Sequence, residues 1–372
     1  MDDAKALYLG LISGTSADGI DAALVRFEDG APHLVAALTH PWPAALRDRI
    51  LAMVQDETRL DLDAYGHLDV AIGSCFADAA LHLLEHSHTS ASAVRAIGSH
   101  GQTLRHRPVG EHPFTLQVGD PSVIAERCGI DVIADFRRAD VAAGGQGAPL
   151  LPVVHAMLLG RTGHTRVVLN LGGIANITVL AADGSVLGFD TGPANGLLDA
   201  WCLRHRGESF DRDGVFAASG HIDETLLHGL LVDPYFALPP PKSTGREHFH
   251  LAWLEAHPRL AALSPADVQA TLLELTARSV TDAILAQAPD AADILACGGG
   301  VHNSVLMRRI SELLAPRDVL STAKFGVDPD YLEATAFAWL ARQRLLGLPG
   351  NLPAVTGARG PRQLGAIYPA PR

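Results

Sequence analysis

The sequence predicts an α/β chain built from two similar domains. Its 372 residues suffice for two domains, since one domain usually takes about 100–200 residues. A strand, a glycine-rich turn and a second strand are expected near residues 6–27 and again near residues 166–190. A third glycine-rich turn follows a buried strand at residues 293–297. We therefore place the domains at residues 1–150 and 151–372.

Composition and charge argue against several classes of partner. Hydrophobic residues make up 48% of the chain and charged residues 19%, which suits two packed cores rather than a disordered chain. The formal net charge of −12 argues against a nucleic acid or an anionic membrane as partner. It does not exclude a phosphorylated ligand, because backbone N–H groups bind phosphate even in an acidic protein.

The cysteines and the N-terminal residues point to the cytoplasm. The four cysteines are far apart and form no CxxC pair, so a reducing compartment is expected. The first residues, MDDAKALYLG, lack the basic and apolar regions of a signal peptide. No uncharged apolar run reaches the ~18 residues that a membrane helix needs.

Periodicity places the elements of the first domain in order. Apolar runs and alternation predict strands, and apolar positions at helical spacing predict helices. The expected elements are strands at 6–12 and 20–27, helices within 44–88, a strand at 93–101, a helix at 122–129 that ends at Gly129, and a strand at 130–136.

The second domain repeats this opening and adds a terminal helix. A helix is expected after the third glycine turn, up to residue 314. Another helix should run to Gly347, with Asp328 as N-cap and Pro329 at its first position. This terminal helix, 330–346, can pack back across a cleft towards the first domain. The tail 348–372 is rich in Pro and Gly and is expected to lie extended on the surface.

The three glycine turns are candidates for binding a nucleotide. The chain has no GxxxxGK[ST] motif, which excludes the usual P-loop. The first turn, 13–19, offers hydroxyls and backbone N–H groups to phosphate oxygens, and Asp18 or Asp21 could hold a hydrated Mg²⁺. An ordinary hairpin is the alternative interpretation. The turns at 170–176 and 298–303 would approach a phosphate and an adenine or ribose, and three such turns indicate a nucleotide in a cleft between the domains.

One carboxylate stands where a kinase needs a base. Asp190 ends a predicted strand in the stretch GFDTGPAN. A phosphoryl-transfer enzyme whose nucleophile is a hydroxyl or water needs a carboxylate base at such a position. The alternative is that Asp190 is an Asx-turn or helix N-cap residue.

A polar stretch at residues 97–148 could bind a carbohydrate. It has no helical period and is rich in side chains that bind hydroxyls or carboxylates. A solvated loop system held by its own salt bridges is the alternative, although long irregular segments in compact domains are often functional. The candidates are His100, Gln102, Asp120, Arg137, Arg138, Asp140 and Gln146.

Seven motifs, in order between residue 10 and about residue 341, resemble the anhydro-N-acetylmuramic acid kinase family. They are GLISGTSADGIDAALV, IGSHGQTLRHRP, LQVGDPSVIAERCGIDVIADFRRADVAAGGQGAPLLP, LNLGGIANIT, FDTGPANGLLDAW, CGGGVHN and EATAFAWLA. The resemblance implies an actin/hexokinase/Hsp70-like (ribonuclease H-like) fold with an ATP cleft between two domains. It also implies hydrolytic opening of the 1,6-anhydro ring of anhydro-N-acetylmuramic acid and phosphorylation of O6, in cell-wall recycling.

The resemblance assigns roles residue by residue. Asp190 would be the catalytic base, and Asp120, Arg137 and Glu333 would contact the sugar. From the polar stretch, His100 and Gln102 are added as substrate-binding candidates. Glu333 keeps a second interpretation, as the N3 residue of a capping box that starts at Asp330. The residues expected around ATP are Gly14, Thr15, Ser16, Ala17, Asp18, Gly19, Ile20, Asp21, Asn170, Gly172, Gly173, Gly298, Gly299, Gly300 and Asn303.

Two other functions remain open at this point. A conventional sugar kinase of the same fold would use Asp190 to deprotonate a substrate hydroxyl directly. An actin- or Hsp70-like module would use ATP to assemble or to switch a partner. We expect Mg²⁺ with ATP, a cytoplasmic location, an amino sugar as the second ligand and, from the family alone, a homodimer.

Overall fold

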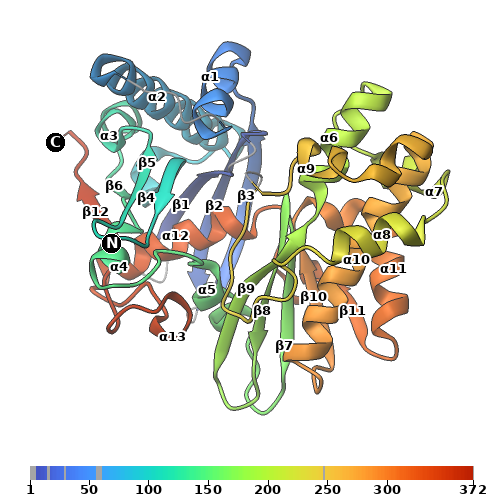
Figure 1. Cartoon of the computed structure of the whole chain (residues 1–372). Coiled ribbons are helices and arrows are strands. Elements are labelled where there is room, and N and C mark those ends of the chain that lie inside the picture. Colours follow the sequence, from blue (N-terminus) through green and yellow to red (C-terminus); the bar gives the residue numbers. More distant parts are fainter. Residues whose placement is uncertain (1–5, 15–16, 29–30, 56–60, 246–247, 372) are drawn as a thin grey trace. The chain divides into compact units, whose positions relative to one another are not determined.

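The chain divides into two compact units in the computed structural model (Figure 1). Unit 1 comprises Met1–Leu158 together with Tyr331–Arg372, and unit 2 comprises Leu159–Asp330. The sequence placed residues 151–372 in one domain, whereas the last part of the chain returns to unit 1. The structure describes residues 6–14, 17–28, 31–55, 61–245 and 248–371.

Unit 1 is built on a mixed sheet that has seven strands within the described residues. The strand order is β12-β6-β4-β1-β2-β3, and β5 pairs with β4. β2 is antiparallel to β1 and β3, whereas β4 is parallel to β1 and to β6. The strands are β1 Leu7–Ser13, β2 Ile20–Glu28, β3 Ala31–His40, β4 Val94–Arg107, β5 Phe114–Val118, β6 Val132–Ala134 and β12 Ala366–Tyr368.

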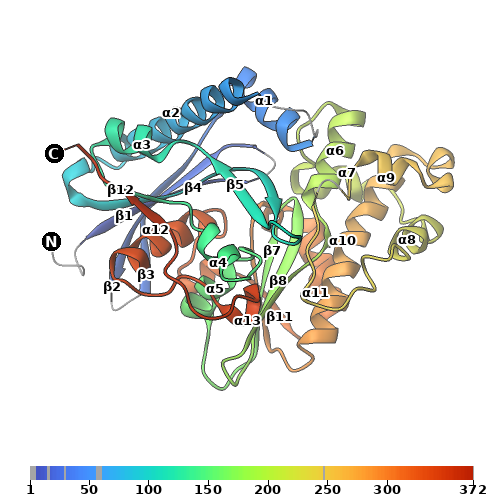
Figure 2. The same ribbon diagram turned by 60° about the vertical axis from the view of Figure 1, so that its left-hand side comes forward.

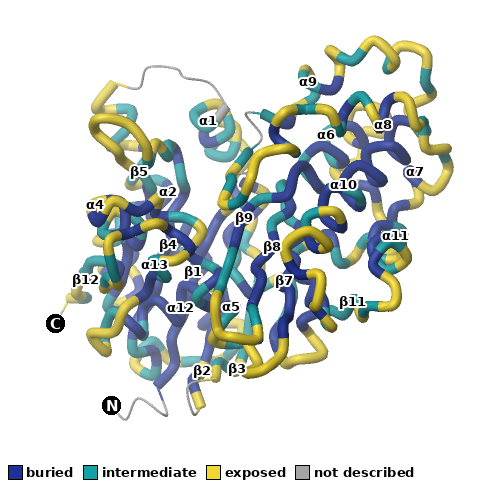
Figure 3. Tube along the Cα trace, turned by 60° about the horizontal axis from the view of Figure 1, so that its bottom comes forward, coloured by how far each residue is buried: buried dark blue, intermediate teal, exposed yellow. Residues whose placement is uncertain are grey.

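Helices cover both faces of this sheet. α2 and α3 share one hydrophobic core with β1 and β4, and α5 and α12 share the core on the other face. α12 packs across β1, β2 and β4 (Figure 2). Every residue of β1 is buried (Figure 3), as expected for a central strand. The helices of unit 1 are α1 Ala44–Gln55, α2 Leu62–His86, α3 Pro121–Cys128, α4 Arg138–Ala142, α5 Leu151–Leu159, α12 Leu332–Leu345 and α13 Pro353–Thr356.

Among the described residues, α2 alone is long and apolar enough to cross a membrane by length and composition. Its buried face, from Leu68 to Leu84, packs against the sheet of unit 1. More than half of its most apolar stretch, 56%, is buried inside the protein, which is typical of a core helix.

Unit 2 repeats the strand order of unit 1. Its sheet has the order β11-β10-β7-β8-β9, with β8 antiparallel to its neighbours and β10 and β11 parallel to β7. This is the arrangement of β6-β4-β1-β2-β3, and it is the topology of the ribonuclease H-like fold. The predicted fold class and duplicated layout are therefore confirmed. The strands are β7 Arg166–Leu171, β8 Ile174–Leu180, β9 Val186–Pro193, β10 Asp293–Cys297 and β11 Asp318–Ser321.

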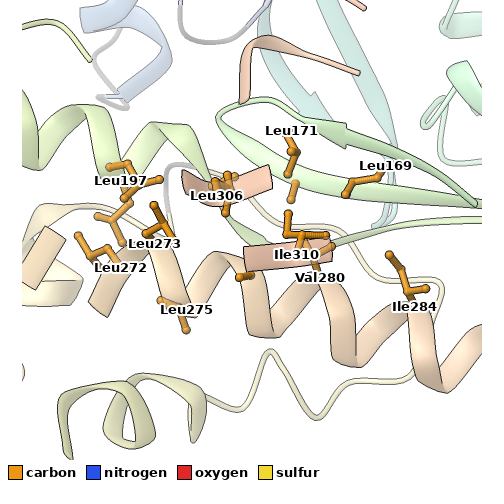
Figure 4. Packing of buried hydrophobic residues seen from close by; sticks show 14 of the residues in the cluster. Leu169, Leu171, Leu197, Leu272, Leu273, Leu275, Val280, Ile284, Leu306 and Ile310 are labelled. Carbon is orange, nitrogen blue, oxygen red and sulfur yellow. The ribbon is translucent and has the colours of Figure 1, made fainter. Parts of the chain in front are cut away.

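The core of unit 2 lies between this sheet and its long helices. Leu169 and Leu171 of β7 meet Val280 of α10 and Ile310 of α11 (Figure 4). α10 begins at an N-cap, Ser264, with Pro265 at the first position. The helices are α6 Asn195–Arg206, α7 Val215–Ala218, α8 Glu224–Leu231, α9 Leu251–Glu255, α10 Pro265–Gln287 and α11 Ser304–Leu314.

Two sequence-based predictions about the C-terminal region are wrong in detail. α12 begins at Leu332 after Tyr331, so neither Asp328 nor Asp330 is its N-cap. The Asp328 side chain instead accepts a hydrogen bond from the N–H of Asp330. The tail is not simply extended, because it forms α13 and the edge strand β12, whose partner β6 is far away in the sequence.

Candidate functional site

In unit 2, the Asp190 carboxylate is held by a segment far away in the sequence. Its Oδ2 atom accepts hydrogen bonds from the Ser243 hydroxyl at 2.8 Å and from the Thr244 N–H at 3.0 Å. Asp190 lies within β9, and the next helix, α6, has Ala194 as its N-cap. The interpretation of Asp190 as a helix N-cap is therefore wrong, and its carboxylate faces loop donors instead.

The main chain of Asp190 is held by the same segment. Its N–H donates to the Lys242 carbonyl at 3.0 Å, and its carbonyl accepts from the Tyr235 hydroxyl at 2.6 Å. Burial, and then the charge of the neighbouring Asp190, raise the pKa of Tyr235 well above its ordinary value. The phenol therefore keeps its proton and remains a hydrogen-bond donor at working pH.

Two of the glycine turns meet within unit 2. The turn at Gly298–Gly300 packs on the hairpin between β7 and β8 so closely that side chains would clash. A Cβ on Gly300 would lie 2.5 Å from the Leu171 Cβ, and one on Gly298 would lie 2.4 Å from the Asn170 Oδ1. A Cβ on Gly299 would meet only the Asn195 side chain, at 4.0 Å. The turns thus form one surface of exposed backbone, which suits a phosphate or nucleoside ligand.

The other predicted residues of these turns have structural partners. Asn303 caps α11, with its Oδ1 accepting from the Leu306 N–H at 3.0 Å. The carbonyls of Gly172 and Gly173 accept hydrogen bonds from the first N–H groups around α6, at 3.0 Å from Asn195 and from Gly196. These contacts fix the start of α6 beside the β7–β8 hairpin.

The first glycine turn belongs to unit 1 and is described only in part. Thr15 and Ser16 lie outside the described residues. Gly14 accepts from the Gln102 side chain at 3.1 Å, so Gln102 supports this turn. Ala17 and Ile20 are fully buried in the core, so their side chains are not available to a ligand.

The two acidic residues of this turn already have partners. The Arg47 guanidinium lies 3.3 Å from the Asp18 carboxylate, and the Thr39 hydroxyl donates to Asp21 at 2.7 Å. A Cβ on Gly19 would come within 2.4 Å of the Thr39 side chain, which explains a glycine there. Within the described residues, no three His, Cys, Asp or Glu side chains gather into a metal site.

His100 and Arg137 form a buried pair in unit 1. The Arg137 Nε donates to the His100 Nε2 at 3.0 Å, and the His100 Nδ1 bonds the Gly101 carbonyl at 2.9 Å. Burial and the Arg137 charge hold the pKa of His100 well below its ordinary value, so the ring is neutral with its proton on Nδ1. Burial also lowers the pKa of Arg137 to about 10, against the attraction of Glu333 and Asp140. Arg137 is therefore still charged near neutral pH, and Glu333 lies within its electrostatic reach.

Asp140 has a structural role rather than the carbohydrate contact expected from the sequence. It is fully buried, and its oxygens accept from the Gly147 N–H at 2.7 Å, the Asn351 amide at 2.6 Å and the Thr356 hydroxyl at 2.7 Å. The Gln146 N–H also donates to the Thr356 carbonyl, at 2.7 Å. These bonds join the segment that carries Arg137 to the C-terminal tail.

Asp120 caps α3, with its side chain accepting from the Ser122 N–H at 2.8 Å. Its two neighbours in the chain, Gly119 and Pro121, line a polar cavity of about 130 Å³. Burial raises the pKa of Asp69 and of Asp135 there, and Asp120 adds to the rise at Asp69. The residues lining the cavity are Tyr65, Asp69, Ser99, His100, Gly101, Gln117, Val118, Gly119, Pro121, Ala134, Asp135, Arg138 and Tyr368.

Sequence reasoning missed the segment that holds Asp190 and most of this cavity. Ser243 lies in PPPKSTG, a turn-rich stretch that signals a loop but not its destination. Asp135 has a positive φ of 62°, which local sequence did not indicate. Tyr65 and Asp69 are four residues apart, which places both on one face of a helix. This spacing was the sequence signal that could have indicated their part of the cavity.

Comparisons with known proteins cover nearly the whole chain. A family model for anhydro-N-acetylmuramic acid kinase matches residues 6–370. The chain is 59% identical over 367 residues to an anhydro-N-acetylmuramic acid kinase of Xanthomonas campestris pv. campestris, with 98% of this chain and 97% of that protein covered. It is 49% identical over 366 residues to the protein of that name from Coxiella burnetii, with 98% of each covered. A solved ROK family glucokinase from Streptomyces griseus, in complex with glucose and AMPPNP, matches 91% of this chain and all of its own at 14% identity and a TM-score of 0.41.

Proposed function

Because the chain belongs to the anhydro-N-acetylmuramic acid kinase family, we propose that it converts anhydro-N-acetylmuramic acid, water and ATP into N-acetylmuramic acid 6-phosphate and ADP. As a member of this family it is a phosphotransferase that acts on a hydroxyl group. The water-consuming opening of the 1,6-anhydro ring and a role in cell-wall recycling are the finer parts of the proposal.

Asp190 is the proposed base. It takes a proton from water as the water oxygen attacks C1 of the sugar, and the bond between C1 and O6 breaks. O6 then attacks the γ-phosphorus, the bond to the β-phosphate oxygen breaks and ADP leaves. The proton on Asp190 returns to solvent. The observation that carries this role is the fixed carboxylate, which accepts from Ser243 and Thr244 on one oxygen.

Arg137 and Glu333 are the proposed sugar-binding residues, and His100 is a hydrogen-bond partner of Arg137. Two of the five guanidinium N–H groups of Arg137 donate to His100 and to the Gly147 carbonyl, at 3.0 Å and 2.7 Å, which fixes the plane of the side chain. A fixed guanidinium suits the carboxylate or hydroxyls of a muramic acid. Asp120 remains a proposed sugar contact beside its capping role.

The proposed ATP-binding groups are the backbone of the glycine turns. The packed turns at Gly298–Gly300 and Gly172–Gly173 support this in unit 2, and residues 14–21 are the candidates in unit 1. Mg²⁺ would neutralise phosphate charge, and since the described residues gather no metal-binding cluster, its ligands would be mainly phosphate and water. A water-mediated contact to Asp18 stays a proposal, as do the cytoplasmic location and a homodimer.

The test is ADP release from ATP and Mg²⁺ by the purified protein with each of three sugars. We expect release with anhydro-N-acetylmuramic acid, with one 6-phosphate product per ADP, and none above background with N-acetylglucosamine or levoglucosan. Asp190→Asn should abolish turnover while ATP binding persists. Sugar-independent ADP release would instead support an ATPase module, and equal rates with N-acetylglucosamine would support a conventional sugar kinase.

A further inference from the structure

We propose that Tyr235 and Ser243 are positioning residues that hold Asp190 in the orientation needed to deprotonate the attacking water. They belong to a segment, Asp233–Thr244, that we call the Asp190 strap. The inference rests on the proposed function, because it gives these residues a role only if Asp190 is the base.

The Asp190 strap holds three different parts of Asp190. The Asp190 N–H donates to the Lys242 carbonyl at 3.0 Å, and the Asp190 carbonyl accepts from the Tyr235 hydroxyl at 2.6 Å. The Oδ2 atom of Asp190 accepts from the Ser243 hydroxyl and the Thr244 N–H, at 2.8 and 3.0 Å. A β-strand residue with these constraints has little freedom to rotate its side chain or to shift its backbone.

The strap itself is tied down, so it can serve as a fixed reference for Asp190. The Lys242 ammonium donates to the carbonyls of Tyr235 and Phe236 at 3.0 and 3.1 Å and lies 4.6 Å from the centre of the Tyr235 ring. Phe236 packs on Gly192 of β9, where a Cβ would come within 2.7 Å of its ring. The Asp233 carboxylate accepts from the Trp253 indole at 2.9 Å.

The two hydrogen bonds to Oδ2 also bear on the protonation of the carboxylate. Donors to an ionised carboxylate favour the charged form, which is the form that can accept a proton. Removing the Ser243 hydroxyl should therefore raise the proton affinity of Asp190 and loosen its orientation together. The Tyr235 hydroxyl donates to the main-chain carbonyl of Asp190 rather than to its carboxylate, so its removal should affect mainly the position of Asp190.

The first test is Ser243→Ala in the full-length enzyme, with anhydro-N-acetylmuramic acid and ATP. We expect kcat to fall about tenfold at neutral pH with both KM values unchanged, since orientation is lost and binding is not. The acid limb of the kcat profile should move to higher pH, because a carboxylate that has lost a hydrogen-bond donor protonates at higher pH. Ser243→Thr restores a hydroxyl and should recover most of kcat and the original limb.

The second test is Tyr235→Phe, which keeps the buried ring and removes one hydroxyl. We expect kcat to fall about three- to tenfold without a change in KM or in the acid limb. The matched control is Ser311→Ala, which removes a hydroxyl that donates to the Met307 carbonyl of its own helix at 2.9 Å. This control should keep wild-type kinetics, and thermal unfolding of every variant reports whether the fold is intact.

Assays of wild type and of Asp190→Asn distinguish failure of the positioning role from failure of the proposed function. If wild type is active, Asp190→Asn is inactive, and both strap variants keep wild-type kcat and pH profile, the inference is wrong and the proposed function stands. Folded variants with raised KM and unchanged kcat would also overturn the positioning role. If Asp190→Asn retains turnover, or wild type does not turn over the anhydro sugar, both proposals fall.

Discussion

Replacing Asp140 by asparagine should destabilise unit 1 strongly, although the two side chains have nearly the same shape. The carboxylate is fully buried and accepts three hydrogen bonds, from Gly147, Asn351 and Thr356. An asparagine can keep its oxygen towards Asn351 and Thr356, but its NH₂ then faces the Gly147 N–H. The asparagine NH₂ and the Gly147 N–H are both donors, so the hydrogen bond that the Asp140 carboxylate now accepts from Gly147 would be lost.

The surrounding chain leaves little room for relief. A Cβ on Gly145 would lie only 2.2 Å from the Asp140 Oδ2, so the backbone is already close to this oxygen. One bond to a charged acceptor is lost, at ~1.5–3 kcal/mol, and one buried N–H is left unsatisfied, at ~1–3 kcal/mol. We expect a loss of about 3–5 kcal/mol in the free energy of unfolding, which for a unit of ~200 residues lowers Tm by roughly 6–20 °C.

The assay is thermal and urea unfolding of Asp140→Asn beside wild type, with Asp48→Asn as control. Asp48 is exposed on α1, so its change should stay within about 0.5 kcal/mol. Because the same segment carries Arg137, we also expect a higher KM for the sugar in Asp140→Asn. A Tm within 2 °C of wild type (roughly 1 kcal/mol or less) would refute the conclusion that this carboxylate joins the Arg137 segment to the C-terminal tail.

Two further predictions concern packing and pH. Gly300→Ala should lower the free energy of unfolding by about 1–3 kcal/mol, because the added Cβ would lie 2.5 Å from the Leu171 Cβ, whereas Gly299→Ala should cost less; equal urea midpoints would contradict this. Burial lowers the pKa of His155 to about 3, so the unfolded chain binds an extra proton between about pH 3 and 6.5, and stability is complete above pH 6.5 and falls below it. Between pH 6.5 and 5, we expect this residue to lower the free energy of unfolding of the wild type by up to ~2 kcal/mol, and His155→Gln to lose less over the same range. The same dependence of the free energy of unfolding on pH in both proteins would contradict this reasoning.

Local patterns in the sequence were enough to predict the repeated units of the fold. β1, β7 and β10 are apolar runs followed by glycine turns, and this signal depends on neighbouring residues alone. The start of α12 was misplaced because Asp328, Pro329 and Asp330 make a good local helix start, whereas the helix begins at Leu332 in the structure.

Contacts between distant residues could not be predicted in this way. Ser243 lies 53 residues from Asp190, and Thr356 lies 216 residues from Asp140. No periodicity or turn chemistry relates such positions, since they meet only when the whole unit folds. The sequence therefore identified Asp190 as the candidate base but not the strap that holds it, and it placed Asp140 among the ligand contacts when it is a buried structural acceptor.

The central claim is that water opens the anhydro ring while ATP phosphorylates O6, and ¹⁸O-labelled water tests it most directly. The enzyme would turn over anhydro-N-acetylmuramic acid and ATP in H₂¹⁸O, with prompt borohydride reduction to stop exchange at C1 and the unlabelled 6-phosphate product as exchange control. The account predicts one ¹⁸O at C1 of the sugar product for each ADP and none in a phosphate group. A 6-phosphate product without label at C1, or label appearing in inorganic phosphate, would contradict it.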